Sequence, residues 1–182
     1  MRNIISLNEN WKFIQKNVGL PSAYPTDWET VDLPHTWNAV DGNDGNGSYD
    51  RGNYWYAKSF ETPKQPLTGG RTFVEILAAN SEASVYINGT KVCYHEGGYS
   101  TFRADITEYC KEEGENLLVV ECSNIANDYV YPQNADFTFY TGSEHQLAHG
   151  VGFRTEAAAL KHLAIFQYQI ALFHRFLDSS SV

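Results

Sequence analysis

The sequence lacks the features that mark several classes of protein. It contains no run of 18 apolar residues, so we expect no membrane-spanning helix and no membrane partner. Only 13 residues are basic against 22 acidic ones, and the net charge is −9 at pH 7. Phosphate backbones repel such a surface, so no nucleic-acid partner is expected either. The 182 residues also fall short of a complete (β/α)8 barrel, which takes about 250 residues.

Cysteine is scarce, with only three residues, which are Cys93, Cys110 and Cys122. An odd number with no metal-binding spacing predicts reduced thiols rather than a disulfide framework. The apolar stretch near Met1 is too short for a secretory signal peptide. Together these features predict a cytoplasmic protein. The sequence also contains no nucleophile elbow of the Gly-x-Ser-x-Gly type.

The chain changes character at residue 142. All four tryptophans, all six prolines, all three cysteines and every asparagine lie within residues 1–142, whereas four of the six histidines lie within residues 143–182. The charges of the second part balance, so the whole net charge belongs to the first part. We therefore expect one domain over residues 1–142 and a separate tail over residues 143–182.

The first part is rich in short strand-forming runs, which glycine, proline, asparagine or aspartate separate. These runs are Tyr54–Tyr56, Phe73–Leu77, Val85–Ile87, Val92–Tyr94 and Leu117–Cys122. Many short strands without alternating helices predict an all-β fold, an antiparallel sandwich or jelly roll. The clearest local signal is Asn88-Gly89, which suits a two-residue hairpin turn and would set Val85 opposite Val92.

The second part has a helical pattern. A run from Thr155 to Leu177 is apolar nearly all round, and only 13 residues separate Lys161 from Arg175, which is too few to span a bilayer. We therefore expect a C-terminal helix that packs against another surface.

Three aromatic groups offer stacking faces for sugars: Trp37-Asn38, Tyr54-Trp55-Tyr56 and Tyr129-x-Tyr131. Such residues more often pack in a core or under a loop. The sequence leaves both interpretations open.

Five collinear segments resemble the N-terminal region of glycoside hydrolase family two, which includes β-galactosidases and β-glucuronidases. They are Leu33–Asn38 (LPHTWN), Tyr49–Phe60 (YDRGNYWYAKSF), Val85–Gly89 (VYING), His95–Thr107 (HEGGYSTFRADIT) and Glu115–Val119 (ENLLV). The resemblance covers residues 1 to about 142. The Gly/Asn-rich loop before Tyr49 is similar to the β-galactosidase side of the family.

The resemblance implies a galactose-binding-like jelly-roll domain that binds sugar as a fragment of a retaining glycosidase. The two catalytic glutamates of the family lie in a later barrel, so the chain is expected to be inactive alone and to hold no catalytic residue. Asn38 and Asp136 match residues that contact the substrate. In some β-galactosidases that aspartate also helps to bind sodium, so the resemblance implies a sodium ligand at Asp136 and no other cofactor.

After Asp136 the sequence departs from the family, because the expected strand of the Ile-Tyr-Arg-Asp-Val kind is missing. We interpret residues 143–182 as frame-shifted or vector-derived sequence; the alternative is a native tail whose helix caps an open sheet edge. That edge or the apolar helix would favour self-association. Two alternatives to the glycosidase fragment remain: a freestanding carbohydrate-binding module, and a structural or interaction sandwich without sugar binding.

Overall fold

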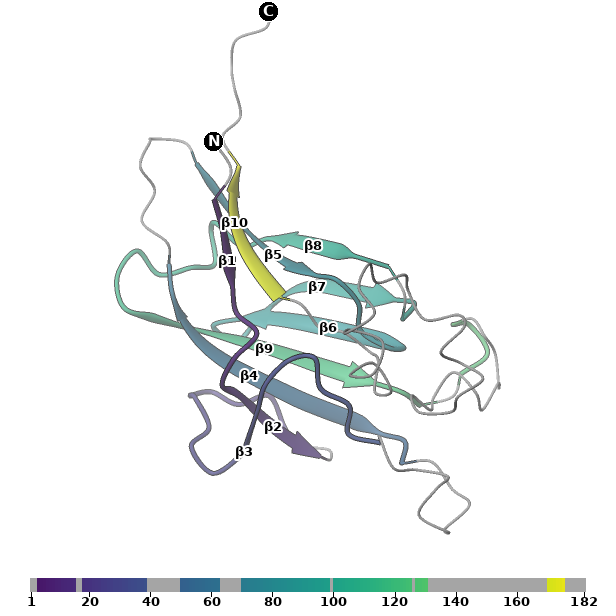
Figure 1. Ribbon diagram of the computed structural model, residues 1–182. Coiled ribbons are helices and arrows are strands. Elements are labelled where there is room, and N and C mark those ends of the chain that lie inside the picture. The colour runs from purple at the N-terminus through teal and green to yellow at the C-terminus, as the bar shows by residue number, and fades with distance from the viewer. Residues whose placement is uncertain are drawn as a thin grey trace, which may run out of the picture.

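Two antiparallel β-sheets pack face to face in the computed structural model (Figure 1). The structure describes residues 3–15, 18–38, 50–62, 70–98, 100–125, 127–130 and 170–175. Its strands are β1 (Asn3–Ser6), β2 (Trp11–Gln15), β3 (Glu29–Val31), β4 (Asn53–Glu61), β5 (Arg71–Ile76), β6 (Glu82–Ile87), β7 (Thr90–Glu96), β8 (Phe102–Asp105), β9 (Glu115–Ser123) and β10 (Ile170–Arg175).

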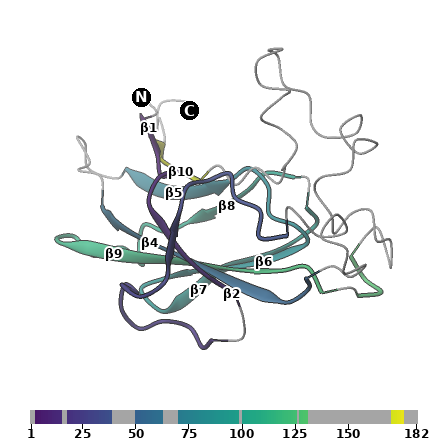
Figure 2. The ribbon, with the colours of Figure 1, turned by 60° about the horizontal axis from the view of Figure 1, so that its bottom comes forward.

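One sheet has four strands in the order β1-β10-β5-β8, and the other has six in the order β3-β2-β4-β9-β6-β7. Figure 2 shows the two layers from a second direction. Every paired strand is antiparallel, which confirms the predicted all-β antiparallel fold. The described part of the chain contains no helix, and hence none long and apolar enough to cross a membrane.

Strand β10 corrects part of the prediction for the tail. Residues 170–175 fall inside the expected helix but form a strand between β1 and β5 (Figure 1). Asn3 pairs with His174 on one side, and Ile76 pairs with Ile170 on the other. A strand in this position gives backbone hydrogen bonds to two neighbours at once, which a helix packed on the edge would not do. The rest of the expected helix, Thr155 to Gln169 and Phe176 to Leu177, lies outside the described residues.

The Asn88-Gly89 hairpin forms as expected between β6 and β7, and both residues have positive φ angles, of 50° and 86°. The register beyond the turn differs from the prediction. Val85 pairs with Cys93 and not with Val92, because a bulge interrupts the ladder between Val85 and Tyr86.

The main core lies between the sheets, and a smaller apolar cluster lies on the outer face of the six-stranded sheet. Strand β4 contributes to both, because successive side chains point to opposite faces. Tyr54 and Tyr56 are buried in the main core, whereas Trp55 and Ala57 are buried in the outer cluster. Half-buried residues from the segment before β3 pack against the outer cluster: Val18, Leu20 and Trp28. This burial on both faces holds β4 in place as the frame of the site described next.

Candidate functional site

Several strands of the six-stranded sheet begin or terminate at the same end of the sandwich. Asn53, at the start of β4, pairs with Ser123 at the end of β9, and Gln15 at the end of β2 pairs with Tyr54. Glu82, at the start of β6, also pairs with Ser123. The loops that continue from these strands therefore gather at one end, which we call the loop end.

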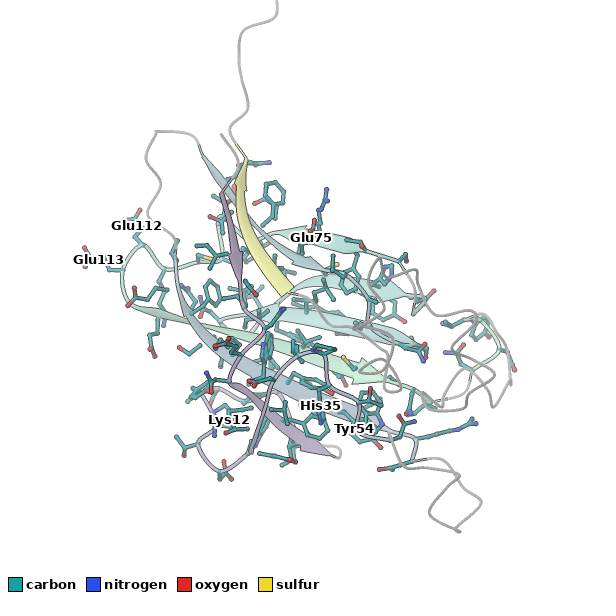
Figure 3. The ribbon with its side chains drawn as sticks, viewed as in Figure 1. Lys12, His35, Tyr54, Glu75, Glu112 and Glu113 are labelled. Atoms are coloured by element: carbon teal, nitrogen blue, oxygen red, sulfur yellow. The ribbon has the colours of Figure 1, made fainter. Side chains whose placement is uncertain are left out.

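The segment Leu33–Asn38 lies against the inner face of β2 and β4, and we call it the strap. The N–H of Leu33 donates to the Asn8 carbonyl at 2.7 Å. The ring of His35 lies edge-on to Phe13, with centroids 4.6 Å apart. Farther along, Trp37 stacks on Tyr54 with centroids 4.1 Å apart. Figure 3 labels His35 and Tyr54 on this part of the molecule. The strap thus brings its last residue to the loop end.

His35 is held neutral within the strap. Its Nδ1 lies 2.9 Å from the Tyr56 hydroxyl. Burial lowers the pKa of His35, and the opposing charge of Glu29 is the weaker effect. Burial also raises the pKa of Tyr56 well above its usual value. The pair is therefore a hydrogen bond between two neutral groups at pH 7 rather than an acid–base pair.

Asn38, which the resemblance assigns to substrate contact, lies at the loop end and is only 4% exposed. Trp37 positions it, because the indole Nε1–H of Trp37 donates to the carbonyl of Asp50 at 3.4 Å. Most of the Asn38 amide is thus packed against protein. Asp136, the other expected contact and sodium ligand, lies outside the described residues.

Asn124 connects the loops of this end, and the sequence analysis did not single it out. Its amide donates to the Asp50 carbonyl at 2.9 Å, and its Oδ1 accepts from the N–H of Gly52 at 2.8 Å. Asn124 is 2% exposed. The available signal was an asparagine two residues after the end of a predicted strand. Through Asp50, Asn124 and Trp37 are tied to the same short segment.

Some residues of the three aromatic groups are buried, and one is exposed. Tyr54, Trp55 and Tyr56 are all buried, so the packing interpretation is confirmed for them. Tyr129 is 89% exposed. Tyr131 lies outside the described residues. Tyr129 is therefore a surface aromatic near the end of the described loop 127–130.

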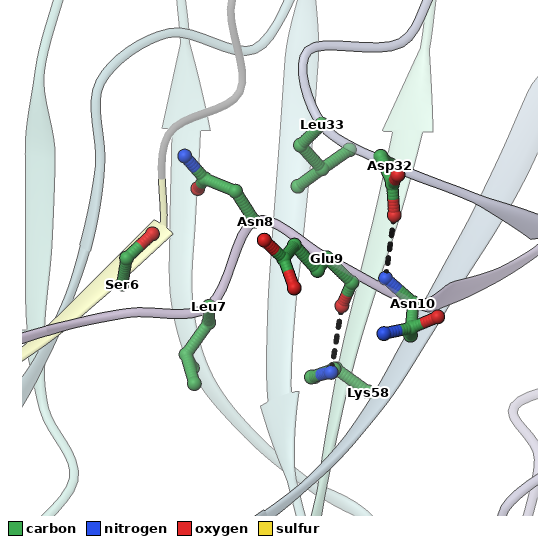
Figure 4. A pocket seen from close by; sticks show the side chains of 8 residues that line it. All are labelled: Ser6, Leu7, Asn8, Glu9, Asn10, Asp32, Leu33 and Lys58. Atoms are coloured by element: carbon green, nitrogen blue, oxygen red, sulfur yellow. Dashed lines mark hydrogen bonds between the residues drawn. The ribbon is translucent and has the colours of Figure 1, made fainter.

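A separate polar pocket of about 590 Å3 lies where the chain passes from β1 to β2 (Figure 4). Lys58 donates to the carbonyl of Glu9, and Asp32 accepts from the N–H of Asn10 (Figure 4). Its polar lining suits small hydrophilic molecules, but nothing in its arrangement selects one of them. Among the described residues, no group of three or more His, Cys, Asp or Glu side chains is placed to hold a metal ion.

Comparison with known proteins identifies the family of this chain. Residues 4–147 match the family described as "Glycosyl hydrolases family 2, sugar binding domain". The chain is 36% identical over 141 residues to a putative β-glucuronidase of Formosa agariphila, covering 75% of this chain and 17% of that protein. It is 32% identical over 130 residues to a β-galactosidase of Bacteroides ovatus, covering 64% of this chain and 15% of that protein.

Solved structures give the same result. An FMN-binding β-glucuronidase from Faecalibacterium prausnitzii L2-6 superposes with a TM-score of 0.69 at 43% sequence identity, covering 96% of this chain and 22% of that one. The chain thus spans about a fifth of the length of the proteins that it matches. On the family match over most of its length, the chain belongs to the sugar-binding domain of glycoside hydrolase family 2.

Proposed function

We propose that this domain supplies one side of the sugar site of a retaining glycosidase that acts on β-galactosides or β-glucuronides. The observation that carries the proposal is the convergence at the loop end. The strap that ends at Asn38 and the loop that leads toward Asp136 are tied to one segment through Asp50. Asp136 follows Val130 by six residues, a reach of at most about 20 Å. The relatives named β-glucuronidase and β-galactosidase support both sugar classes.

In this proposal Asn38 and Asp136 bind sugar hydroxyls. A carboxylate accepts two hydroxyl hydrogen bonds, whereas an amide both donates and accepts. Because Asn38 is nearly buried, its main part in the site is to shape the base of the site. Asp136 is the main sugar contact in this proposal, and it also serves as a sodium ligand.

The chain alone is proposed to bind sugar weakly and to hydrolyse none, because the two glutamates of the retaining mechanism have no counterpart in it. The domain alone lacks the contacts and the preorganised geometry that the other side of the sugar site would supply. We expect a dissociation constant in the millimolar range or weaker.

An NMR titration of the full chain tests this proposal. Methyl β-D-galactoside and methyl β-D-glucuronide are added separately, in sodium and in potassium buffer, and the amide signals are followed. We expect shifts at Asn38, Asp136 and their neighbours for one of the two sugars, and no shifts in the folded Asp136→Ala variant. Stronger binding in sodium than in potassium supports the ion.

Shifts centred away from the loop end would favour a freestanding carbohydrate-binding module. A folded chain without any shift at high millimolar sugar would contradict the half-site and leave the structural alternative. Release of 4-nitrophenol from a 4-nitrophenyl glycoside, surviving repurification and lost with Asp136→Ala, would contradict the absence of hydrolysis.

Three finer expectations belong to the same proposal. Jelly-roll connectivity is proposed from the two-sheet antiparallel arrangement. Function in a reducing compartment such as the cytoplasm is proposed from Cys93, Cys110 and Cys122, none of which forms a disulfide bond. Self-association is proposed through the edge strand β1 or β3, and a molar mass from light scattering above 20.5 kDa would support it.

A further inference from the structure

Tyr129 is the most exposed large hydrophobic residue in the described part of the chain. It is 89% exposed, whereas the next are Tyr94 and Ile125, at 48% each. A tyrosine ring loses little conformational entropy when it binds, and its face suits another flat, weakly polar ring. A ring kept out of the core in this way is available to a ligand.

The turn that carries Tyr129 is fixed by one side chain. The Oδ1 of Asn127 accepts from the N–H of Tyr129 at 2.9 Å and from the N–H of Val130 at 2.6 Å. The side-chain amide of Asn127 donates to Glu82 at the start of β6. Glu82 in turn accepts from the hydroxyl of Tyr94 at 2.9 Å. The turn is thus anchored to the sheet, and Tyr129 projects from an ordered support.

Val130 also anchors the turn, because its side chain packs into the protein. It is buried, although its neighbour Tyr129 is exposed. The backbone therefore has a defined inner and outer side at this point, and Tyr129 lies on the outer one. A fixed support lowers the entropy lost on binding.

The turn belongs to the loop end. It follows Asn124, which binds the segment that also accepts the indole N–H of Trp37. Glu82, to which Asn127 is bonded, pairs with Ser123 at the end of β9. The exposed ring therefore stands on the same rim as the strap that carries Asn38.

We propose that Tyr129 is a stacking contact for the substrate, an inference that rests on the proposed sugar site. Its ring face takes a flat, weakly polar ring of the glycoside, which is either the pyranose itself or an aromatic leaving group. Tyr129 therefore contributes to selection of the substrate and takes no part in bond cleavage.

The test follows the ring signals of Tyr129 in the full chain during titration with a methyl glycoside and with the matching 4-nitrophenyl glycoside, in the galactose and the glucuronic acid series. Stacking on the pyranose shifts the Tyr129 ring equally with both ligands. Stacking on the leaving group shifts it with the 4-nitrophenyl ligand only. We expect Tyr129→Ala to weaken binding about two- to tenfold, and Tyr129→Phe to keep most of it.

Tyr109→Ala is the matched control. Tyr109 is also partly exposed, but its carbonyl accepts from Asn88 at the β6–β7 hairpin, at the other end of these strands. This variant is expected to bind like the unmodified chain. The Tyr129 site is surface-exposed, so Tyr129→Ala is expected to fold normally.

The test distinguishes failure of the stacking contact from failure of the proposed sugar site. Shifts at Asn38 and Asp136 with an unmoved Tyr129 ring and unchanged affinity of Tyr129→Ala would overturn the stacking contact and leave the sugar site standing. A shifted Tyr129 ring with silent Asn38 and Asp136 would overturn the proposed half-site and support a separate aromatic site. No binding of any of the four glycosides would overturn both.

Discussion

The indole of Trp37 lies on the ring of Tyr54, with centroids 4.1 Å apart and planes inclined by 21°. Tyr54 belongs to β4 and is buried, whereas Trp37 belongs to the strap and is half-buried. The contact therefore fixes the strap, which has no regular secondary structure, to a central strand of the six-stranded sheet. Asn38, the next residue, is positioned by this contact.

Trp37→Ala should release the end of the strap. The lost stacking and burial should lower the free energy of unfolding by about 2 to 3 kcal/mol, measured by urea denaturation. Sugar-induced shifts at Asn38 should disappear as well. Trp28→Ala is the matched control, because Trp28 is half-buried on the outer face of the same sheet. It should lower stability but keep the sugar response, and an equal loss of that response in both variants would argue against a specific role of Trp37.

His35 should make stability depend on pH. Its pKa is lowered in the folded protein, so the unfolded chain takes up a proton more readily from its usual pKa of 6.5 downward. The contribution of His35 to the free energy of unfolding should therefore be fully present above about pH 6.5 and fall as the pH falls from there toward the folded-state pKa. Urea denaturation of the unmodified chain and of His35→Phe, at several pH values from about 5 to 8, measures this contribution. The same pH dependence in both proteins would contradict it.

Gly98 leaves no room for a side chain. A Cβ atom at this position would lie 2.8 Å from both Cβ and Cγ of Asn80, and closer still to its Oδ1. Gly98→Ala should therefore lower the free energy of unfolding by about 1 to 3 kcal/mol. Gly19→Ala is the control, because a Cβ at Gly19 would meet nothing within 4 Å. Thermal unfolding of the two variants side by side checks the difference, and equal midpoints would contradict the close packing.

Asn124→Ala should loosen the loop end. It removes the side-chain acceptor of the Gly52 N–H in a partly buried place and one of the two side-chain donors to the Asp50 carbonyl, which keeps the indole N–H of Trp37. This loss should cost about 1 to 3 kcal/mol. Hydrogen exchange at the amide of Gly52 should speed up more than exchange in β6 or β9. Unchanged protection of Gly52 would show that Asn124 does not hold these loops together.

Local patterns in the sequence determined much of the fold. Each short run of strand-forming residues that was singled out lies almost wholly within one observed strand, and Asn88-Gly89 forms the expected turn. These features depend on neighbours in the chain, on turn chemistry and on alternation of side chains between two faces. The family resemblance, which rests on five such local segments, is confirmed by the match over residues 4–147.

Contacts between distant parts of the chain decided the rest. The bulge at Val85 shifts the predicted register, and β6 pairs on its other side with β9, which the hairpin sequence cannot specify. Residues 170–175 form a strand because β1 and β5 lie on either side of them, although their own sequence suits an apolar helix.

The candidate site shows the same division. The sequence alone marked Asn38 and the aromatic groups and favoured packing for the aromatic residues, but it did not indicate that Tyr129 would be exposed. Nor did it indicate Asn124, whose partner Gly52 is 72 residues away. Residue type and local pattern determine which side chains can bind sugar. Only packing between sheets and loops decides which of them remain accessible, because burial depends on what the folded chain brings against each residue.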